Sequence, residues 1–445
     1  MSGRRFANAV LLAGASISAA ATVFAVGSAM GHGGLTLRAV ALAAGPLLLA
    51  AVFLLALRLP IDGRIALAVT CLSLALAVYA AEWYLRELPV WRMKRIARSL
   101  GMKYDPRTKI EVLRDLRRRG VDAWPAMAPE LLFGSHDPTF LPLGGISNVV
   151  TVSCNEIGSY LVYRSDEHGF HNPPGLWSSP ALEVAAVGDS YAQGRCVPSE
   201  QNMVALIRKK YPATLNLGMS GNGPLTDLAN VLEYLTLLQP RRILWFYYEG
   251  NDLTDDLPRD LSDRMLARYL EAGFRQNLLS RQAEIDSFLK RRVEEKYLEA
   301  EQRFLERQAE DRWQGALRLR TLRASLGLAV WKHPESFAGV DYPLFRRILL
   351  TARDAARTWD GRIYFVYLPA SGRYLSGDLR RLNDEVRVKI LTILRELGIP
   401  LIDLTGPIGE APVDELYAPN GGHFTPRGYS LAAEHVLQAL DAGGR

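Results

Sequence analysis

Four short polar segments in the C-terminal half contain residue types that could carry out chemistry on an ester. The first is Gly188-Asp189-Ser190, which directly follows the apolar run Val184 to Val187. An apolar run of this length next to glycine is typical of a buried parallel strand, and open α/β sheets bind ligands at the carboxyl ends of their strands. Ser190 is therefore a candidate nucleophile, although an Asp-Ser pair is also preferred at a helix N-cap.

The other three segments supply the partners that a serine nucleophile needs. Gly218 and Asn251 each follow an apolar segment that reads as a strand, and His423 comes just before the last predicted helix. If the fold brings these segments to one edge of a sheet, they provide a backbone N–H donor, an amide donor and a base beside Ser190. This is the minimum set for acyl transfer at an ester.

The elements that would position these residues alternate between strand and helix. Strands are predicted at 183–187, 214–217, 243–248, 363–368 and 400–404. Helices are predicted at 191–210, 225–238, 342–358, 378–397 and 426–440. This alternation predicts an α/β fold with a parallel sheet that is covered on both faces. The charged stretch at about 253–335 has apolar residues at helical spacing, which predicts a helical insertion, either a packed elaboration or a lid.

In these segments the chain resembles the SGNH, or GDSL-type, hydrolase family, which is named for a serine, a glycine, an asparagine and a histidine in four blocks. The matching segments, in chain order, are Gly188-Asp189-Ser190, Gly218, Asn251-Asp252 and His423. The resemblance covers roughly residues 180 to 445 and implies a flavodoxin-like, doubly wound parallel sheet. It also implies that Ser190 is the nucleophile and His423 the general base. The Ser190 and Gly218 amides and the Asn251 side chain would then form the oxyanion hole, and no cofactor is needed.

The sequence departs from the family pattern in two blocks. The third block usually reads Gly-x-Asn-Asp, and Glu249 stands at its first position here. The last block usually reads Asp-x-x-His, and Asn420 lies three residues before His423. An asparagine can orient an imidazole but supplies no charge to stabilise imidazolium. We expect a Ser190–His423 pair oriented by Asn420 or a backbone carbonyl; the alternatives are another carboxylate, such as Asp414, or a weakened enzyme.

The N-terminal part of the chain contains three uncharged apolar segments, at 6–30, 39–57 and 65–81. Each approaches the length needed to cross a bilayer as a helix. A cleaved signal peptide fits only the first of them, because the basic residues Arg4 and Arg5 precede it. We expect three transmembrane helices in residues 1–86, a basic juxtamembrane connector at 87–140, and a hydrolase-like domain at 141–445.

The charges that flank these segments favour opposite orientations. The cluster from Arg86 to Arg98 favours a cytoplasmic C-terminal part by the positive-inside rule, whereas Arg4 and Arg5 favour a cytoplasmic N-terminus. Long domains translocate largely regardless of charge. We therefore expect an inner-membrane protein with a periplasmic, or otherwise extracytoplasmic, catalytic domain.

The chain has three cysteines, and Cys71 lies within the third apolar segment. Cys154 and Cys196 remain as a candidate disulfide, and two free buried cysteines are the alternative. A bridge between them would close a loop of about 40 residues and contribute roughly 3 to 4 kcal/mol. Disulfides persist in oxidising compartments, so this bridge and the periplasmic orientation support each other.

The charge and the spacing of potential ligands argue against some classes of function. The net charge of +6 over 445 residues is modest, and neither a base-stacking pattern nor a zinc spacing is present, which argues against nucleic acid and metal as ligands. His168 and His171 have no third ligand nearby and are expected to be ordinary surface residues.

The leading hypothesis is a membrane-anchored serine esterase or O-acyltransferase that acts on an O-acyl (acetyl) ester of a cell-envelope glycan. A transferase with so few membrane helices would need a membrane partner to deliver the acyl donor. The alternative is a weak or inactive module that binds a glycan or a partner protein in envelope polysaccharide assembly.

Overall fold

The computed structural model of the chain describes residues 2–31, 37–134, 139–326, 339–419 and 422–442. The chain forms two compact units. The first, here called the helical unit, comprises Met1–Glu87 and Arg312–Ala329. The second, here called the α/β unit, comprises Leu88–Asp311 and Val330–Arg445.

The α/β unit is built on a five-stranded sheet with the order β5-β4-β6-β7-β8, in which every pairing is parallel. Its strands are β4 (Val184–Val187), β5 (Thr214–Asn216), β6 (Arg242–Tyr248), β7 (Arg362–Leu368) and β8 (Leu401–Asp403). Counted along the chain, this is the 2-1-3-4-5 order of flavodoxin-like sheets. The predicted α/β fold with a doubly wound parallel sheet is therefore confirmed.

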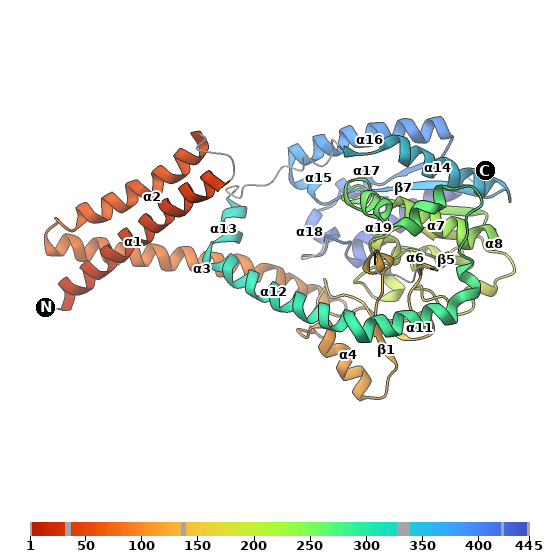
Figure 1. Cartoon of the computed structure of the whole chain (residues 1–445), viewed down its shortest axis with the longest axis horizontal. Helices are drawn as coiled ribbons and strands as arrows, with labels where there is room; N and C mark the ends of the chain where they lie inside the picture. Colours follow the sequence, from red (N-terminus) through yellow and green to blue (C-terminus); the bar gives the residue numbers. More distant parts are fainter. Residues whose placement is uncertain (1, 32–36, 135–138, 327–338, 420–421, 443–445) are drawn as a thin grey trace. The chain divides into compact units, whose positions relative to one another are not determined.

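Helices cover both faces of this sheet (Figure 1). The helices concerned are α6 (Met203–Arg208), α7 (Pro224–Asn230), α14 (Tyr342–Arg357), α16 (Gly377–Leu397) and α19 (Pro426–Ala442). Ala185 and Val187 of β4 share a core with α7, α14 and α16, whereas Val184 and Ala186 share the other core with α6 and α19. Because successive side chains of a strand point to opposite faces, a strand between two helical layers must be apolar throughout.

The prediction of one continuous helix at 191–210 is wrong. The chain instead forms α5 (Ser190–Gln193), the 3-10 helix η3 (Ser199–Gln201) and α6. Gly194 ends α5 in the left-handed conformation with φ 76°, and Cys196 follows with φ 64°. A residue with positive φ cannot continue a right-handed helix, so the helix breaks here.

The helix expected at 225–238 is continuous, but its middle turn is widened. It comprises α7, the π-helix η4 (Val231–Leu235) and α8 (Thr236–Leu238).

A small second sheet precedes the large one in the α/β unit. It consists of β1 (Ala123–Pro125), β2 (Val150–Val152) and β3 (Val162–Arg164), with β1 parallel to β2 and β2 antiparallel to β3. The helix α4 (Lys109–Arg118) and the 3-10 helices η1 (Pro129–Leu132) and η2 (Leu176–Ser178) accompany it. Residues expected to form only a basic connector thus contribute a strand to a folded sheet.

Helices fill the stretch between β6 and α14. In chain order they are η5 (Asp252–Asp256), α9 (Leu257–Ser262), α10 (Arg264–Ala267), η6 (Arg268–Leu270), η7 (Leu278–Arg281), α11 (Gln282–Arg292), η8 (Val293–Tyr297), α12 (Leu298–Leu317) and α13 (Arg320–Ser325). Leu278, Ile285 and Leu289 are buried in the same core as the large sheet. The first part of this insertion is therefore packed onto the α/β unit. After α14, the short helices α15 (Gly372–Leu375), α17 (Thr405–Gly409) and α18 (Val413–Leu416) complete the unit.

The helical unit contains α1 (Ser2–Gly31), α2 (Leu37–Ala56) and the N-terminal part of α3 (Ile61–Ser99). Among the described residues, two helices are long and apolar enough to cross a membrane, at Gly3–Gly27 and Ile61–Ser99. The expectation of three such helices is therefore corrected to two. In the middle segment, the apolar helical stretch found among the described residues is Ala44–Ala56, and Pro46 lies within it.

Candidate active site

Ser190 occupies a tight turn between β4 and α5. Gly188 has φ 147°, and a Cβ atom there would lie 2.8 Å from both Cβ and the carbonyl oxygen of Phe246, so the turn requires glycine. The Asp189 side chain caps α5 by accepting a hydrogen bond from the Tyr191 amide at 2.9 Å. These contacts fix Ser190 as the first residue of α5, with only 7% of its surface exposed.

His423 lies in the loop before α19 and is held by an aromatic cluster. The Ala418 amide donates a hydrogen bond to the His423 carbonyl at 2.7 Å, and Tyr417 forms a β-bridge with Phe424. The buried Phe424 ring packs edge-on against Tyr191, with ring centroids 5.0 Å apart. The Tyr191 hydroxyl in turn donates to the Gly422 carbonyl. His423 Nε2 thereby lies 2.8 Å from Ser190 Oγ.

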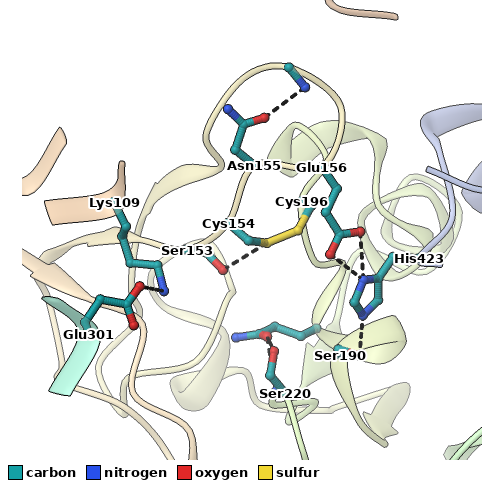
Figure 2. Close-up of a disulfide and its surroundings, with 12 residues drawn as sticks. Lys109, Ser153, Cys154, Asn155, Glu156, Ser190, Cys196, Ser220, Glu301 and His423 are labelled. Atoms are coloured by element: carbon teal, nitrogen blue, oxygen red, sulfur yellow. Dashed lines mark hydrogen bonds and ion pairs between the residues drawn. A yellow bond between two sulfur atoms is a disulfide. The ribbon is translucent and has the colours of Figure 1, made fainter. Parts of the chain in front are cut away.

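The other imidazole nitrogen contacts a carboxylate that the sequence did not single out. His423 Nδ1 lies 2.8 Å from both Oε1 and Oε2 of Glu156, as Figure 2 shows. A carboxylate only accepts hydrogen bonds, so the Nδ1 beside it carries the proton, and Nε2 is free to accept from the Ser190 hydroxyl. Ser190, His423 and Glu156 thus have the connectivity of a serine-histidine-acid triad.

A hairpin of the small sheet brings Glu156 to the histidine. Glu156 lies in the loop between β2 and β3, and the Leu161 amide closes the hairpin by donating to the Cys154 carbonyl at 2.9 Å. Cys154 forms a disulfide with Cys196, with an S–S distance of 2.04 Å and a sequence separation of 42. Cys196 lies just after α5, so the disulfide joins the loop of the acid to the turn that follows the nucleophile (Figure 2).

The far side of the Glu156 loop rests on the C-terminal part of α3. The Asp105 amide donates to the Gly158 carbonyl at 2.8 Å, and Ile157 is buried with Ile96 packed against the same core. Gly158 has φ 96°, and a Cβ atom there would lie 2.6 Å from the Met93 carbonyl oxygen. The loop that carries Glu156 is therefore held from both sides.

The predicted oxyanion-hole residues lie at the same sheet edge, but they are not equally available. Gly218 packs so closely on α5 that a Cβ atom would lie 2.5 Å from Ala192 Cβ. Its amide already donates to Asn216 Oδ1 at 2.9 Å. Asn251 follows β6, the parallel neighbour of β4, and its buried Oδ1 has no hydrogen-bond partner among the described residues. The Ser190 amide, in the first turn of α5 where a helix offers no acceptor, is the more available backbone donor. The Asn251 side chain would donate through Nδ2, while its Oδ1 can only accept.

Among the described residues, the carboxylate found beside the imidazole is not one that the sequence suggested. Asn420 lies outside the described residues. Asp414 lies in α18 and is exposed, and its backbone carbonyl accepts a hydrogen bond from Arg92 at 2.6 Å. Glu156 occupies the place beside Nδ1 instead. One sequence signal points to it: Glu156 is two residues after Cys154, whose predicted partner Cys196 lies near the nucleophile.

Buried carboxyl groups surround the turn behind Ser190. They are Asp189, Asp227, Asp252, Asp256 and Asp260, and each is at most 2% exposed. Burial raises the pKa of all five, to about 7 for Asp256 and to about 8 for Asp260. Arg259 pairs with Asp256 at 2.6 Å and partly opposes the shift of its pKa. A raised pKa favours the uncharged carboxyl form, and the uncharged form places less negative charge near the substrate oxygen that becomes an oxyanion.

Potential metal ligands in this region are already engaged by other protein groups. Glu156, Cys196 and His423 form the metal-compatible group found among the described residues, but the Cys196 sulfur is bonded to Cys154. His171 is buried rather than on the surface as expected. It contacts the Gln193 carbonyl at 3.0 Å and Ser199 Oγ at 2.9 Å. Burial lowers its pKa to about 4, so His171 is neutral and structural.

Comparison with known proteins finds similarity at the level of structure. No protein-family model matches the chain, and no curated protein matches it significantly. The structure is similar to a member of the lipolytic protein G-D-S-L family from Veillonella parvula, with 16% identity over 58% of this chain and 97% of that chain and a TM-score of 0.31.

It is also similar to the lipase/acylhydrolase from Enterococcus faecalis, with 16% identity over 59% and 96% of the two chains and a TM-score of 0.33. The esterase EstA from Pseudoalteromonas sp. is similar at 10% identity over 59% and 97%, with a TM-score of 0.32. At these identities the likeness concerns the fold alone.

Proposed function

We propose that this chain is a membrane-anchored serine esterase of the SGNH type, with Ser190 as nucleophile, His423 as general base and Glu156 as the acid of the triad. The observation that carries the proposal is the continuous contact from Ser190 Oγ to His423 Nε2 and from His423 Nδ1 to Glu156, at 2.8 Å in each step. A serine hydroxyl is a weak nucleophile at neutral pH, and an adjacent oriented base is what activates it.

The proposed reaction proceeds through an acyl-enzyme. Ser190 Oγ attacks the ester carbonyl while its proton moves to His423 Nε2, and the Glu156 carboxylate stabilises the imidazolium. The Ser190 amide and the Asn251 side chain donate hydrogen bonds to the oxyanion. His423 then protonates the departing alcohol. A second hydroxyl, from water or from an acceptor sugar, attacks the acyl-enzyme by the same steps in reverse.

We infer an O-acyl, in particular O-acetyl, ester of a cell-envelope glycan as the substrate. The inference is supported by the apolar helices of the N-terminal part, which suit an inner-membrane protein, and by the Cys154–Cys196 bridge, which suits an oxidising, periplasmic location of the catalytic domain. If the acceptor is a sugar rather than water, the enzyme is an O-acyltransferase. It would then require a membrane partner that delivers the acyl group.

The nucleophile is tested by covalent labelling of the full-length protein with a fluorophosphonate. The label is expected on Ser190 in the wild type and is expected to disappear in Ser190→Ala and His423→Ala, together with a loss of p-nitrophenyl acetate hydrolysis of about 10⁴-fold or more. Ser220→Ala is the matched control, because the Ser220 hydroxyl donates to Gln193 Oε1 at 2.6 Å and not to the histidine. Labelling that persists in Ser190→Ala would refute the assignment.

The acceptor is tested separately with an acetylated envelope polysaccharide. Release of acetate from the polysaccharide supports the esterase. An acetylated sugar formed only when an unmodified acceptor is added supports the transferase.

A further inference from the structure

The last turns of α12 and the helix α13 belong to the helical unit and are joined there to α3. This segment, Arg312 to Leu326, is here called the insertion tip. Arg86 donates a hydrogen bond to the Arg312 carbonyl at 2.7 Å, and the Tyr79 hydroxyl donates to the Leu317 carbonyl at 3.2 Å. In both hydrogen bonds the acceptor is a backbone oxygen of the insertion tip. They therefore position the backbone of the tip rather than a single side chain.

A buried glutamate fixes the start of α13 on the same helix. Glu82 is 2% exposed, and its carboxylate accepts hydrogen bonds from the Thr321 amide at 3.2 Å and the Leu322 amide at 2.6 Å. A carboxylate at a helix N-terminus satisfies amides that have no partner within the helix and interacts favourably with the helix dipole. The start of α13 in the insertion tip is thus bound to α3 at Glu82.

Glu82 marks the end of the apolar part of α3. Residues 65–81 contain no charge, and Glu82 directly follows them. Trp83 and Tyr84 come next and are 62% and 50% exposed. Tryptophan and tyrosine gather where a membrane helix passes through the headgroup region, so this part of α3 has the composition of a membrane interface.

The insertion tip has the same composition on its own surface. Trp313, Leu317 and Leu326 are 73%, 65% and 62% exposed. The tip also has four exposed arginines, Arg312, Arg318, Arg320 and Arg323, and its sequence has no acidic residue. Exposed large apolar side chains among arginines are typical of segments that lie in a bilayer interface and contact anionic headgroups.

We propose that the insertion tip is an interfacial membrane-binding element. Trp313, Leu317 and Leu326 enter the headgroup and upper acyl region, and the four arginines contact anionic lipid headgroups. Lipid is the partner that both observations favour, because the tip has four exposed arginines and no acidic residue in its own sequence and is fixed beside the end of a candidate membrane span. The inference rests on the proposed membrane anchoring through α3 and adds a second membrane contact to it.

The test places a spin label at single cysteines of the full-length protein in liposomes that contain about 30% anionic lipid. The background is Cys71→Ser, since Cys71 is the free thiol and Cys154 and Cys196 are bonded to each other. Labels at Trp313→Cys and Leu317→Cys are expected to be more accessible to oxygen than to a water-soluble nickel chelate. Gln308→Cys, an exposed polar position of α12, is the matched control and is expected to show the opposite order.

Two further measurements distinguish membrane contact by the insertion tip from membrane anchoring through α3. A label on native Cys71 of the wild type reports whether α3 lies in the bilayer at all. Replacing Arg318, Arg320 and Arg323 by glutamine, one at a time, is expected to lower the ratio of immersed to water-exposed label at position 313 by about fivefold per residue.

The possible outcomes distinguish the membrane anchoring through α3 from the membrane contact of the insertion tip. A Cys71 label exposed to water would refute the membrane anchoring, and the insertion tip would lose its basis with it. A bilayer-protected Cys71 label together with nickel-accessible labels at positions 313 and 317 would refute the insertion tip alone. Immersed labels that do not respond to the arginine replacements would refute the contact with anionic headgroups.

Discussion

The two sheets of the α/β unit each supply part of the proposed triad, and they hold its members in place by different means. The large sheet presents Ser190 at the end of β4, within a continuous buried core that also includes the aromatic residues around His423. The small sheet has three strands of three residues each and presents Glu156 on a loop. Core packing therefore positions Ser190 and His423, whereas the position of Glu156 depends on a disulfide and a few hydrogen bonds in addition to the burial of its neighbour Ile157 in the same core.

This difference implies that the acid can be disturbed while the nucleophile and base remain in place. Apart from Ile157, which is buried in the core of the large sheet, the Glu156 loop makes its close contacts with Cys196 and with the C-terminal part of α3. The position of the acid should thus depend on the covalent bridge and on α3. The following predictions test that separation, beginning with the largest expected loss of activity.

The first prediction removes the charge of the acid. Glu156→Gln is expected to lower kcat by about 10² to 10⁴-fold with little change in KM, because the imidazolium loses its partner and an amide can hold the wrong tautomer. The melting temperature should change little, since glutamine preserves the size and shape of the Glu156 side chain, which is only 13% exposed. Ester hydrolysis and thermal melting measured on the same preparation check both statements.

The matched control for this prediction is Asp414→Asn, which changes the carboxylate that the sequence alone offered as an alternative. It is expected to leave kcat unchanged. A large loss in Asp414→Asn with none in Glu156→Gln would reverse the assignment and remove the basis of the comparison between the sheets.

The second prediction removes the disulfide. Replacing Cys154 and Cys196 by serine is expected to lower the free energy of unfolding by about 3 to 4 kcal/mol, because the bridge closes a loop of 42 residues. Turnover is expected to fall by roughly 10 to 100-fold at temperatures where the variant remains folded, because Glu156 is two residues from Cys154. Dithiothreitol should reproduce both effects in the wild type.

Fluorophosphonate labelling separates the two possible roles of the bridge. Slow but detectable labelling of Ser190 in the double variant is expected if the nucleophile and base remain in place. Full turnover in a variant that only melts earlier would show that the bridge stabilises the fold without positioning the acid.

The third prediction concerns the support from α3. Gly158→Ala is expected to lower turnover by about tenfold, because its methyl group would meet the Met93 carbonyl oxygen and push the Glu156 loop away. Gly175→Ala is the matched control: Gly175 also has a positive φ, at 88°, but no atom of the described residues lies within 4 Å of the place that a Cβ would occupy. Both variants carry a conformational cost of roughly 1 kcal/mol in stability, so equal turnover in the two would contradict a role for α3.

The fourth prediction concerns the buried aspartates near the large sheet and tests how the free energy of unfolding depends on pH. The pKa values of Asp256 and Asp260 in the folded protein, about 7 and about 8, lie above the ordinary value of 3.8. The folded state therefore binds more protons than the unfolded state between these limits, and its stability falls as pH rises from about 4 through 8. We expect a loss on the order of 3 to 4 kcal/mol between pH 6 and pH 8 in denaturant titrations.

Asp260→Asn is the matched variant for the pH dependence. Its side-chain oxygen can still accept the hydrogen bond that Asp260 receives from the Thr226 amide at 2.8 Å, but it cannot titrate. The slope of stability against pH should become shallower in this variant. Stability that increases with pH over the same window would show that these carboxyls are ionised in the folded protein.

Several features of this protein could be predicted from local sequence. The fully apolar strand Val184–Val187 between a charged residue and glycine, and the alternation with amphipathic helices, predict the parallel sheet because burial on both faces imposes that pattern. The same alternation places Ser190 and Asn251 at strand ends on one sheet edge. Local propensity also predicts long helices such as Gly377–Leu397, whose apolar residues recur at helical spacing.

Other features depended on contacts between distant segments. His423 and Glu156 are 267 residues apart, and no periodicity connects them. Asn420 stands three residues before His423, and the proposed acid Glu156 is contributed by the small sheet that precedes the large one. The break after α5 likewise depends on Cys196, whose left-handed conformation is set in a turn tied to Cys154 by the disulfide.

The sequence by itself thus determined the large sheet and the proposed nucleophile and base, Ser190 and His423, because strand burial and turn chemistry are encoded in neighbouring residues. The tertiary structure alone decided the third member of the triad. An ionisable side chain becomes the acid of a triad through its distance from the imidazole, and that distance depends on how the hairpin of Glu156 is tied to the turn after Ser190. The elevated pKa values of the buried aspartates are also tertiary, because desolvation depends on what surrounds a carboxyl group in space rather than along the chain.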